Sequence, residues 1–246
     1  MIDKLVVALL GLLIGYIGGY AGIGGAPFMI AFLVLVMGLD QHTAQGTVLT
    51  MMLGPMSLMA LVSLWKETKS QWKNILIGIV SYAVFSYFGA LLAFSIDESR
   101  LKKYFGLMLI LTAVFQLWHN KDAENQKTHI PWYWMLLIGA AAGVIGGFFG
   151  VGAGILFIPV FISLFGLKKN YARALSLGIL LPPVSIGAFI KYYQMGAIRW
   201  DYVFILFTGY FLANYFGARH GSRISLKKFK VVYSLILLAL GVLYLV

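Results

Sequence analysis

The chain has 246 residues, of which 61% are hydrophobic and 11% are charged, and it contains no cysteine. Soluble domains average about 45–50% apolar and about 25% charged residues, so this composition is typical of a membrane protein. The lack of cysteine excludes disulfides, thiolate metal sites and thiol redox chemistry. The net charge of +11 lies in short loops, where membrane topology and anionic lipid headgroups account for it, so we expect no nucleic-acid partner.

We predict an all-α integral membrane protein with five apolar segments in each half. The first half contains the segments 4–20, 24–38, 44–65, 74–95 and 101–118, and the second half contains 131–149, 153–166, 171–194, 199–219 and 228–246. A polar stretch separates the halves. The predicted domains are therefore a first transmembrane repeat (1–118), a cytoplasmic linker (119–130) and a second transmembrane repeat (131–246).

The second segment of each half is short for a membrane span. Its length of about 15 residues corresponds to about 22 Å of helix, against a hydrocarbon core of about 30 Å. The first two segments of each half are therefore compatible with a re-entrant pair that does not fully cross. Counts of eight to ten spans all fit the sequence.

The two halves are related by an internal repeat. Residues 15–24 read GYIGGYAGIG and residues 143–152 read GVIGGFFGVG, at an offset of 128 residues that needs no gap (Gly18 to Gly146). We interpret the chain as a duplicated membrane protein, and interrupted apolar helices at matched positions indicate a transport site. Further matches at this offset are Gly15/Gly143, Gly19/Gly147, Gly22/Gly150, Gly24/Gly152, Gly38/Gly166, Pro55/Pro183 and Phe88-Gly89-Ala90 with Phe216-Gly217-Ala218.

An odd number of segments in each half predicts that the halves face opposite sides of the membrane, as an inverted repeat. With the linker in the cytoplasm, most Lys and Arg residues fall in cytoplasmic loops, as the positive-inside bias requires. Matched loops differ in the same sense, because residues 38–45 contain no Lys or Arg whereas residues 166–173 contain three. We therefore expect both termini outside.

The glycine-broken first and second helices of each half are the candidate substrate site. A break leaves the next half-helix with unpaired N–H groups and about half a positive charge, which favours anions. The alternative is close helix packing, since these glycines also have small-xxx-small spacing, and both roles are compatible. The candidate backbone contacts are Gly22, Gly24 and Gly25 in the first half and Gly150, Gly152 and Gly154 in the second.

Polar side chains in the later segments add further candidates. All 8 Asp and Glu residues lie in loops or at segment ends, whereas cation carriers usually need a carboxylate within the membrane, so the interior suits an anion. Gln45-Gly46-Thr47 begins the third segment, and we select Thr47 and Ser176 as hydroxyl donors. Lys191 and Asn214 are further candidates, although snorkelling equally explains Lys191 and interhelical hydrogen bonding equally explains Asn214.

We expect neither an enzyme nor a metal or cofactor site. The 4 histidines all lie in predicted loops, so no segment contains the histidine that an intramembrane serine protease needs. The H-E-x-x-H motif of metalloproteases is also missing from the sequence. The alternative to a transporter is a non-transporting membrane scaffold or assembly protein.

The chain resembles the TauE/SafE family of membrane proteins, also called sulfite exporters, over nearly its whole length. The resemblance rests on the GIGGAPF break, the HTAQGTV start of the third segment, the repeated Phe-Gly-Ala positions and the second GVGAGILFIP break. It implies a secondary transporter of the cytoplasmic (inner) membrane that moves sulfite, an organosulfonate or a related sulfur or carboxylate anion. We accordingly expect alternating access, with a small anionic substrate and the lipid bilayer as partners; the sequence leaves transport direction, coupling ion and oligomeric state open.

Overall fold

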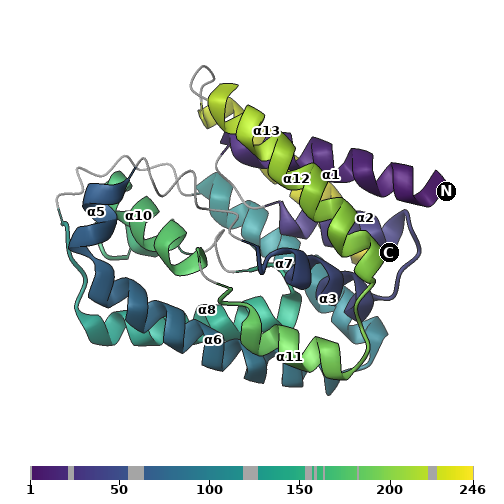
Figure 1. The fold of residues 1–246 in the computed structure, drawn as a ribbon, viewed down its shortest axis with the longest axis horizontal. Helices are drawn as coiled ribbons and strands as arrows, with labels where there is room; N and C mark the ends of the chain where they lie inside the picture. The colour runs from purple at the N-terminus through teal and green to yellow at the C-terminus, as the bar shows by residue number, and fades with distance from the viewer. Residues whose placement is uncertain are drawn as a thin grey trace.

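The computed structural model describes residues 2–21, 25–54, 64–118, 127–152, 157, 160–162, 164–181, 183–220 and 226–245. The elements in these ranges are α-helices, apart from an isolated parallel bridge between Lys127 and Leu167, which agrees with the predicted all-α fold. In chain order (Figure 1) the helices are α1 (Ile2–Ala21), α2 (Ala26–Leu35), α3 (Gln41–Met51), α5 (Trp65–Ser70), α6 (Trp72–Phe94), α7 (Glu98–Trp118), α8 (Trp132–Phe149), α10 (Lys169–Leu180), α11 (Ile186–Gln194), α12 (Trp200–His220) and α13 (Leu226–Leu245).

Most of the helices fall into two length classes. Helices α1, α6, α7, α8, α12 and α13 have 18 to 23 residues, and at about 1.5 Å per residue they match a hydrocarbon core of about 30 Å. Helices α2, α3, α10 and α11 have 9 to 12 residues and reach about half that depth. In the first half, α1 is therefore long enough to cross a membrane, whereas the two helices that follow it, α2 and α3, are too short to cross by themselves.

The third apolar segment of each half, 44–65 and 171–194, is not a single continuous helix. Helix α3 ends at Met51, before a bend at Gly54, and α10 ends at Leu180 before α11 begins at Ile186. In the second half the reason is Pro183, which lacks the N–H that continues a helix. The matched Pro55 and the neighbouring Pro182 lie outside the described residues.

Helices at matched positions, related by the offset of 128 residues, make matched contacts. Helix α1 packs along α12, and its match α8 packs along α6, which is the match of α12 (Figure 1). Helix α7 packs along its own match, α13. The first long helix of each half therefore packs on the other half.

Glycines set these two helix crossings in the same way. A Cβ added to Gly15 would lie 2.5 Å from the carbonyl oxygen of Tyr210, and one added to Gly143 would lie 2.6 Å from the carbonyl oxygen of Tyr82. Four residues earlier on α1 and α8, a further pair of glycines approaches the partner carbonyl oxygens at 3.1 Å and 3.0 Å. Side chains would keep the backbones apart, so these repeated glycines serve close helix packing.

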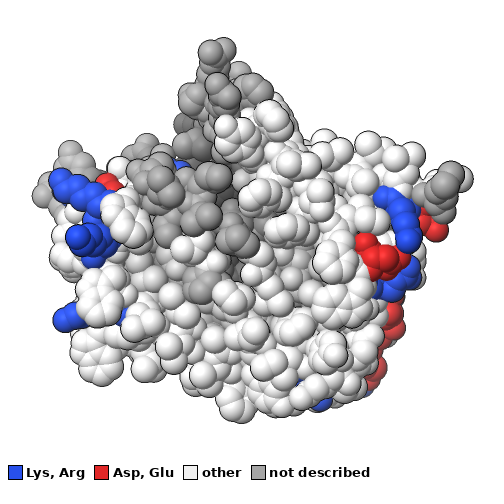
Figure 2. Space-filling view, viewed as in Figure 1, with Lys and Arg blue, Asp and Glu red and all other residues white. Residues whose placement is uncertain are grey.

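Charged side chains gather at two ends of the molecule, with a broad uncharged surface between them (Figure 2). The linker end consists of α5, residues 127–130 and the starts of α6 and α8, where Gln71 and Asn74 donate hydrogen bonds of 3.0 Å and 2.7 Å to carbonyl oxygens of residues 128 and 130. The terminal end consists of the starts of α1, α7 and α12, where Lys4 and Asp201 form an ion pair of 3.9 Å. Exposed tryptophans at both ends fit an interfacial aromatic belt: Trp65, Trp72, Trp132 and Trp134 at the linker end and Trp200 at the terminal end.

The surface between the two ends is apolar. Large hydrophobic side chains such as Val80, Leu137 and Phe204 are more than half exposed, which water would oppose and lipid favours. Among the described residues, α6 and α8 are the helices that are long and apolar enough to cross a membrane by themselves.

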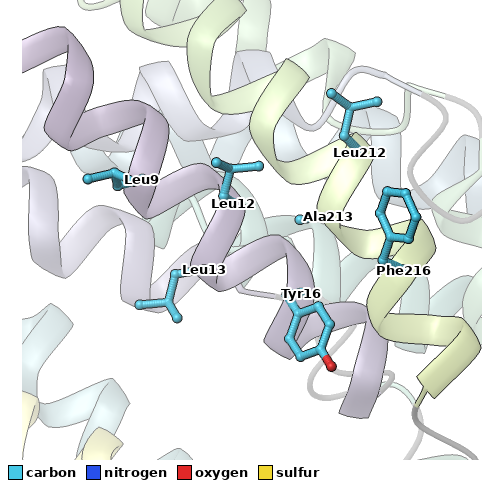
Figure 3. Close-up of a pocket in the computed structure, with 7 residues that line it drawn as sticks. All are labelled: Leu9, Leu12, Leu13, Tyr16, Leu212, Ala213 and Phe216. Atoms are coloured by element: carbon cyan, nitrogen blue, oxygen red, sulfur yellow. The ribbon is translucent and has the colours of Figure 1, made fainter.

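A hollow of about 600 Å³ lies on this apolar surface, between α1 and α12 (Figure 3). Leucines of α1 line one side of it, and Leu212, Ala213 and Phe216 of α12 line the other. None of its lining residues is charged, so it suits a lipid acyl chain better than an anion.

Candidate functional site

Helix α3 is a polar helix buried in the centre of the molecule. Asp40 begins it as an N-cap and accepts a hydrogen bond of 2.8 Å from the Thr43 N–H. The helix reads QHTAQGTVLTM, and most of its residues are buried despite their polarity. Two of its three threonine hydroxyls donate to the carbonyl oxygen one turn back, Thr47 to Thr43 at 2.6 Å and Thr50 to Gly46 at 2.7 Å. Of its two glutamines, Gln45 has a side-chain partner on another helix.

The glycine break at the end of α8 lies against α3. Gly150 and Gly152 have φ angles of 71° and 62°, which glycine adopts without the steric cost that a Cβ brings. A Cβ added to Gly150 would lie 2.7 Å from Cβ of Gln45, and one added to Gly152 would lie 2.5 Å from Cε of Met52. The break of the second half is therefore shaped around a helix of the first half.

A hydrogen-bonded group connects this break to α11. The Tyr192 hydroxyl lies 2.7 Å from Oε1 of Gln45 and 3.4 Å from the carbonyl oxygen of Gly147. The shorter distance is typical of an O–H···O bond, so the hydroxyl donates to Gln45. Both side chains are fully buried, and Nε2 of Gln45 has no hydrogen-bond partner among the described residues.

Gln41 lies one turn before Gln45 on the same face of α3. Its backbone N–H donates to Oε1 of Glu98 at 3.2 Å, but its side chain is 0% exposed and both side-chain polar atoms lack a partner within the described chain. We name the group of Gln41, Gln45, Gly147, Gly150 and Tyr192 the central polar cluster.

Helix α3 is also joined to the loop between α11 and α12. Oγ1 of Thr47 accepts a hydrogen bond of 3.0 Å from the Arg199 N–H, so the Thr47 hydroxyl both donates and accepts within the fold. The Arg199 guanidinium points to the terminal end and bonds the Asp201 carboxylate at 3.2 Å. This hydrogen bond is the main reason why the pKa of Arg199 is raised, which keeps the side chain charged.

Helix α11 carries Tyr192 and the candidate Lys191. Its first turn is held on α6 by Ser86, whose hydroxyl accepts a hydrogen bond of 3.1 Å from the Ala188 N–H. Nζ of Lys191, which is only partly buried, lies 5.8 Å from the ring centre of Phe94, a cation–π arrangement. The Phe94 ring also packs on Tyr192 with a centroid separation of 4.9 Å. Lys191 therefore lies beside the central polar cluster, on its terminal side.

Two further candidates lie elsewhere, around Tyr210. Gly25 precedes α2 with φ of −89°, and a Cβ there would clash with the Ile14 side chain and lie 3.6 Å from the Tyr210 ring. Asn214 is one turn further along α12, beside Tyr210. Gly25 and Asn214 are therefore near each other, but no described contact connects them to the central polar cluster.

The remaining predicted residues are separate from this site or cannot be located. Ser176 is buried on α10, which packs on α5 and α6. Gly22, Gly24 and Gly154 lie outside the described residues. The structure thus brings together Gly150, Gly152, Thr47 and Lys191 around α3 and α11.

The sequence did not identify the side chains of the central polar cluster as site residues. Gln45 is a polar residue at the start of an apolar segment. This position in the sequence could have indicated that its side chain is buried. Tyr192 gave no such signal, because it lies in an apolar segment and meets Gln45 across 147 residues.

Long apolar helices between two charged ends, with short helices and glycine breaks at the centre, define a helical membrane protein with a buried polar interior. Its described residues hold no cluster of side chains suited to a metal ion. The chain belongs to the sulfite exporter TauE/SafE family of membrane transporters, whose profile matches residues 7–244. The family resemblance inferred from the glycine motifs is confirmed.

Relatives with assigned names are described as transporters and not as enzymes. Probable membrane transporter protein YdhB of Bacillus subtilis is 32% identical over 226 residues, which cover 89% of this chain and 89% of the relative. A probable membrane transporter protein of Methanocaldococcus jannaschii is 29% identical over 256 residues, covering 95% and 92%. Probable membrane transporter protein YfcA of Escherichia coli is 27% identical over 220 residues, covering 88% and 78%. No solved structure matches the chain.

Proposed function

We propose that this protein is a secondary transporter that moves a small anion across the inner (cytoplasmic) membrane by alternating access. The substrate class is sulfite, an organosulfonate or a related sulfur or carboxylate anion. The family supplies the transporter class. The observation that carries the choice of an anion is the central polar cluster, where Gln45, whose buried amide N–H donors have no partner among the described residues, lies against a left-handed glycine break. The described Asp and Glu residues all lie at the two ends of the bundle, which disfavours a cation.

Burial of the cluster supports alternating access. Gln45 and Tyr192 are 0% exposed, so a solute reaches them only when the surrounding helices move. Those helices come from both halves, since α3 belongs to the first half and α8 and α11 belong to the second. Movement of one half against the other therefore opens and closes the site, as in other transporters built from repeats.

Contacts at the two ends favour an inverted repeat. Helix α6 starts at the linker end, beside residues 128 and 130, whereas its match α12 starts at the terminal end beside Lys4. The matched turns at Gly38 and Gly166 also lie at opposite ends. The turn at Gly38 leads into α3, where the Gln41 N–H bonds Glu98 at the terminal end. The carbonyl oxygen of Gly166 instead accepts a hydrogen bond from the Lys127 N–H at the linker end. A two-fold axis in the membrane plane produces this relation.

The proposed topology follows from this symmetry. The first transmembrane repeat (1–118) and the second (131–246) form one multi-pass bundle, and the linker (119–130) lies in the cytoplasm with the linker end. Both termini then lie outside. The proposed substrate contacts are the backbones of Gly22, Gly24, Gly25, Gly150, Gly152 and Gly154 and the side chains of Thr47, Ser176, Lys191 and Asn214.

Flux measurements in proteoliposomes test the proposal. Vesicles with and without the purified full-length chain are loaded with sulfite, sulfoacetate or acetate, and efflux is followed over time. We expect at least one anion to leave faster through the protein, and binding of that anion to raise the melting temperature in detergent. Equal rates in both vesicle types for all three anions would favour the scaffold alternative and overturn the proposal.

A further inference from the structure

Two buried glutamines of α3 are incompletely hydrogen-bonded within the described part of the chain. Oε1 and Nε2 of Gln41 and Nε2 of Gln45 have no partner among the described residues, although both side chains are 0% exposed. Buried polar groups are nearly always paired in native proteins, because they lose water and need a replacement. The two side chains are one helical turn apart, so their donors line the same side of α3.

Tyr192 determines which end of the Gln45 amide is offered to a ligand. A side-chain amide has one carbonyl oxygen and an NH₂ group with two donors, and the Tyr192 hydroxyl occupies the oxygen at 2.7 Å. The tyrosine ring is itself held in place, by the edge of Phe94 on one side and by Gly46, where a Cβ would lie 2.8 Å from the ring atom Cδ1. The unpaired end of Gln45 therefore carries N–H donors alone.

We infer that Gln41 and Gln45 form an anion-selective binding element on α3, in which their Nε2 groups donate to oxygen atoms of the substrate and Tyr192 is the positioning residue. The inference rests on the proposed transport function and assigns the side chains that select its substrate class. Sulfite, sulfonates and carboxylates share the required chemistry, which is a negatively charged oxygen that accepts several hydrogen bonds.

The charges around the element are consistent with an anion. Lys191 follows the cluster on its terminal side and places a cation 5.8 Å from the Phe94 ring centre. Two described carboxylates lie beside Gln41 at the start of α3. That of Asp40 accepts the N-cap hydrogen bond of 2.8 Å from the Thr43 N–H, and that of Glu98 bonds the Gln41 backbone N–H and forms an ion pair of 2.9 Å with Lys102. Both charges are therefore engaged within the fold.

The test uses three variants of the full-length protein in proteoliposomes: Gln41→Leu, Gln45→Leu and Tyr192→Phe. KM and Vmax are measured with whichever of sulfite, sulfoacetate and acetate the wild type moves fastest. We expect each glutamine variant to raise KM by about ten- to a hundred-fold, the effect of losing a hydrogen bond to a charged group. Tyr192→Phe leaves the donors present but lets the amide rotate, so KM rises by a smaller factor while Vmax is retained.

Thermal unfolding separates this role from a structural one. Because no described residue pairs with either side-chain polar atom of Gln41, Gln41→Leu leaves the melting temperature unchanged or raises it, while KM rises. If Gln41 were needed only for folding, its replacement would instead lower the melting temperature and leave KM unchanged. The matched control is Gln116→Leu on α7, which also replaces a buried glutamine but lies outside the cluster and leaves KM unchanged.

Tyr192→Phe in the Gln45→Leu background completes the design, because a positioning residue has nothing left to position there. We expect the second substitution to add no further change in KM. If the wild type transports a probe anion and all three variants keep its KM, the inference is overturned and the proposed function stands. If the wild type neither binds nor moves any of the three anions, both are overturned.

Discussion

Gly150→Ala is expected to disturb the site through two separable effects. Alanine at a left-handed φ of 71° costs about 1–2 kcal/mol. Its Cβ would also lie 2.7 Å from Cβ and 2.9 Å from Cγ of Gln45, whereas carbon atoms pack at about 3.5–4.0 Å. Gln45 must therefore move by about 1 Å, away from the position in which Tyr192 holds it. Gly38→Ala is the matched control, because its φ is 68° and nothing lies within 4 Å of the added Cβ.

Thermal unfolding and transport kinetics measure the two effects. For a chain of this size, 1 kcal/mol changes the melting temperature by about 2–4 °C, so we expect Gly38→Ala to lower it by about 2–8 °C without changing KM. Gly150→Ala should lower it at least as much and raise KM by about ten-fold, the size of one lost hydrogen bond to a charged group. Equal changes of both quantities in the two variants would refute the assignment of Gly150 to the site.

Three further predictions concern the packing around the site. Gly15→Ala and Gly143→Ala should each destabilise the protein by about 1–3 kcal/mol in thermal unfolding, because both crowd a carbonyl of the crossing helix; a large difference between them would contradict the equivalence of the two crossings. Thr47→Val leaves the Arg199 N–H without its acceptor and should lower the free energy of unfolding by about 1–3 kcal/mol. Hydrogen exchange at the Arg199 amide should become faster, and unchanged exchange would contradict the role of this bond. Asp201→Asn removes exposed ion pairs and should lower the free energy of unfolding by less than about 1 kcal/mol at low salt and not at all at high salt. A larger or salt-independent loss of stability would show that the pairs matter more than their exposure implies.

The sequence was sufficient for the helical fold and for the internal repeat. Apolar stretches of span length placed the long helices within a few residues, as for α1, predicted at 4–20 and observed at Ile2–Ala21. The matched glycines anticipated matched helix crossings, because close backbone approach needs the same small residues in both halves. The bend at Gly54 in the first of the third segments was not predictable from hydropathy, since an apolar stretch remains apolar across a bend, whereas a proline such as Pro183 marks the interruption in the second half.

The candidate site was predictable only in its backbone. The glycine pattern placed the break at Gly150 and Gly152, whose left-handed angles the structure bears out. The side chains that face this break were beyond the sequence, because Gln45 meets Tyr192 through the packing of α3 against α8 and α11 and not through any local spacing.

Packing of α1 on α12 and of α8 on α6 has a consequence for biogenesis. A nascent chain releases α1 into the membrane roughly 180 residues before its partner α12 is synthesised, and domains otherwise tend to mature in order from the N-terminus. Neither half is a finished unit when it leaves the translocon, and a fragment that stops at the linker exposes a glycine-rich face to lipid. Assembly of this protein is therefore staged: α8 can join α6 as soon as it is made, whereas α1 waits for α12 in the last third of the polypeptide.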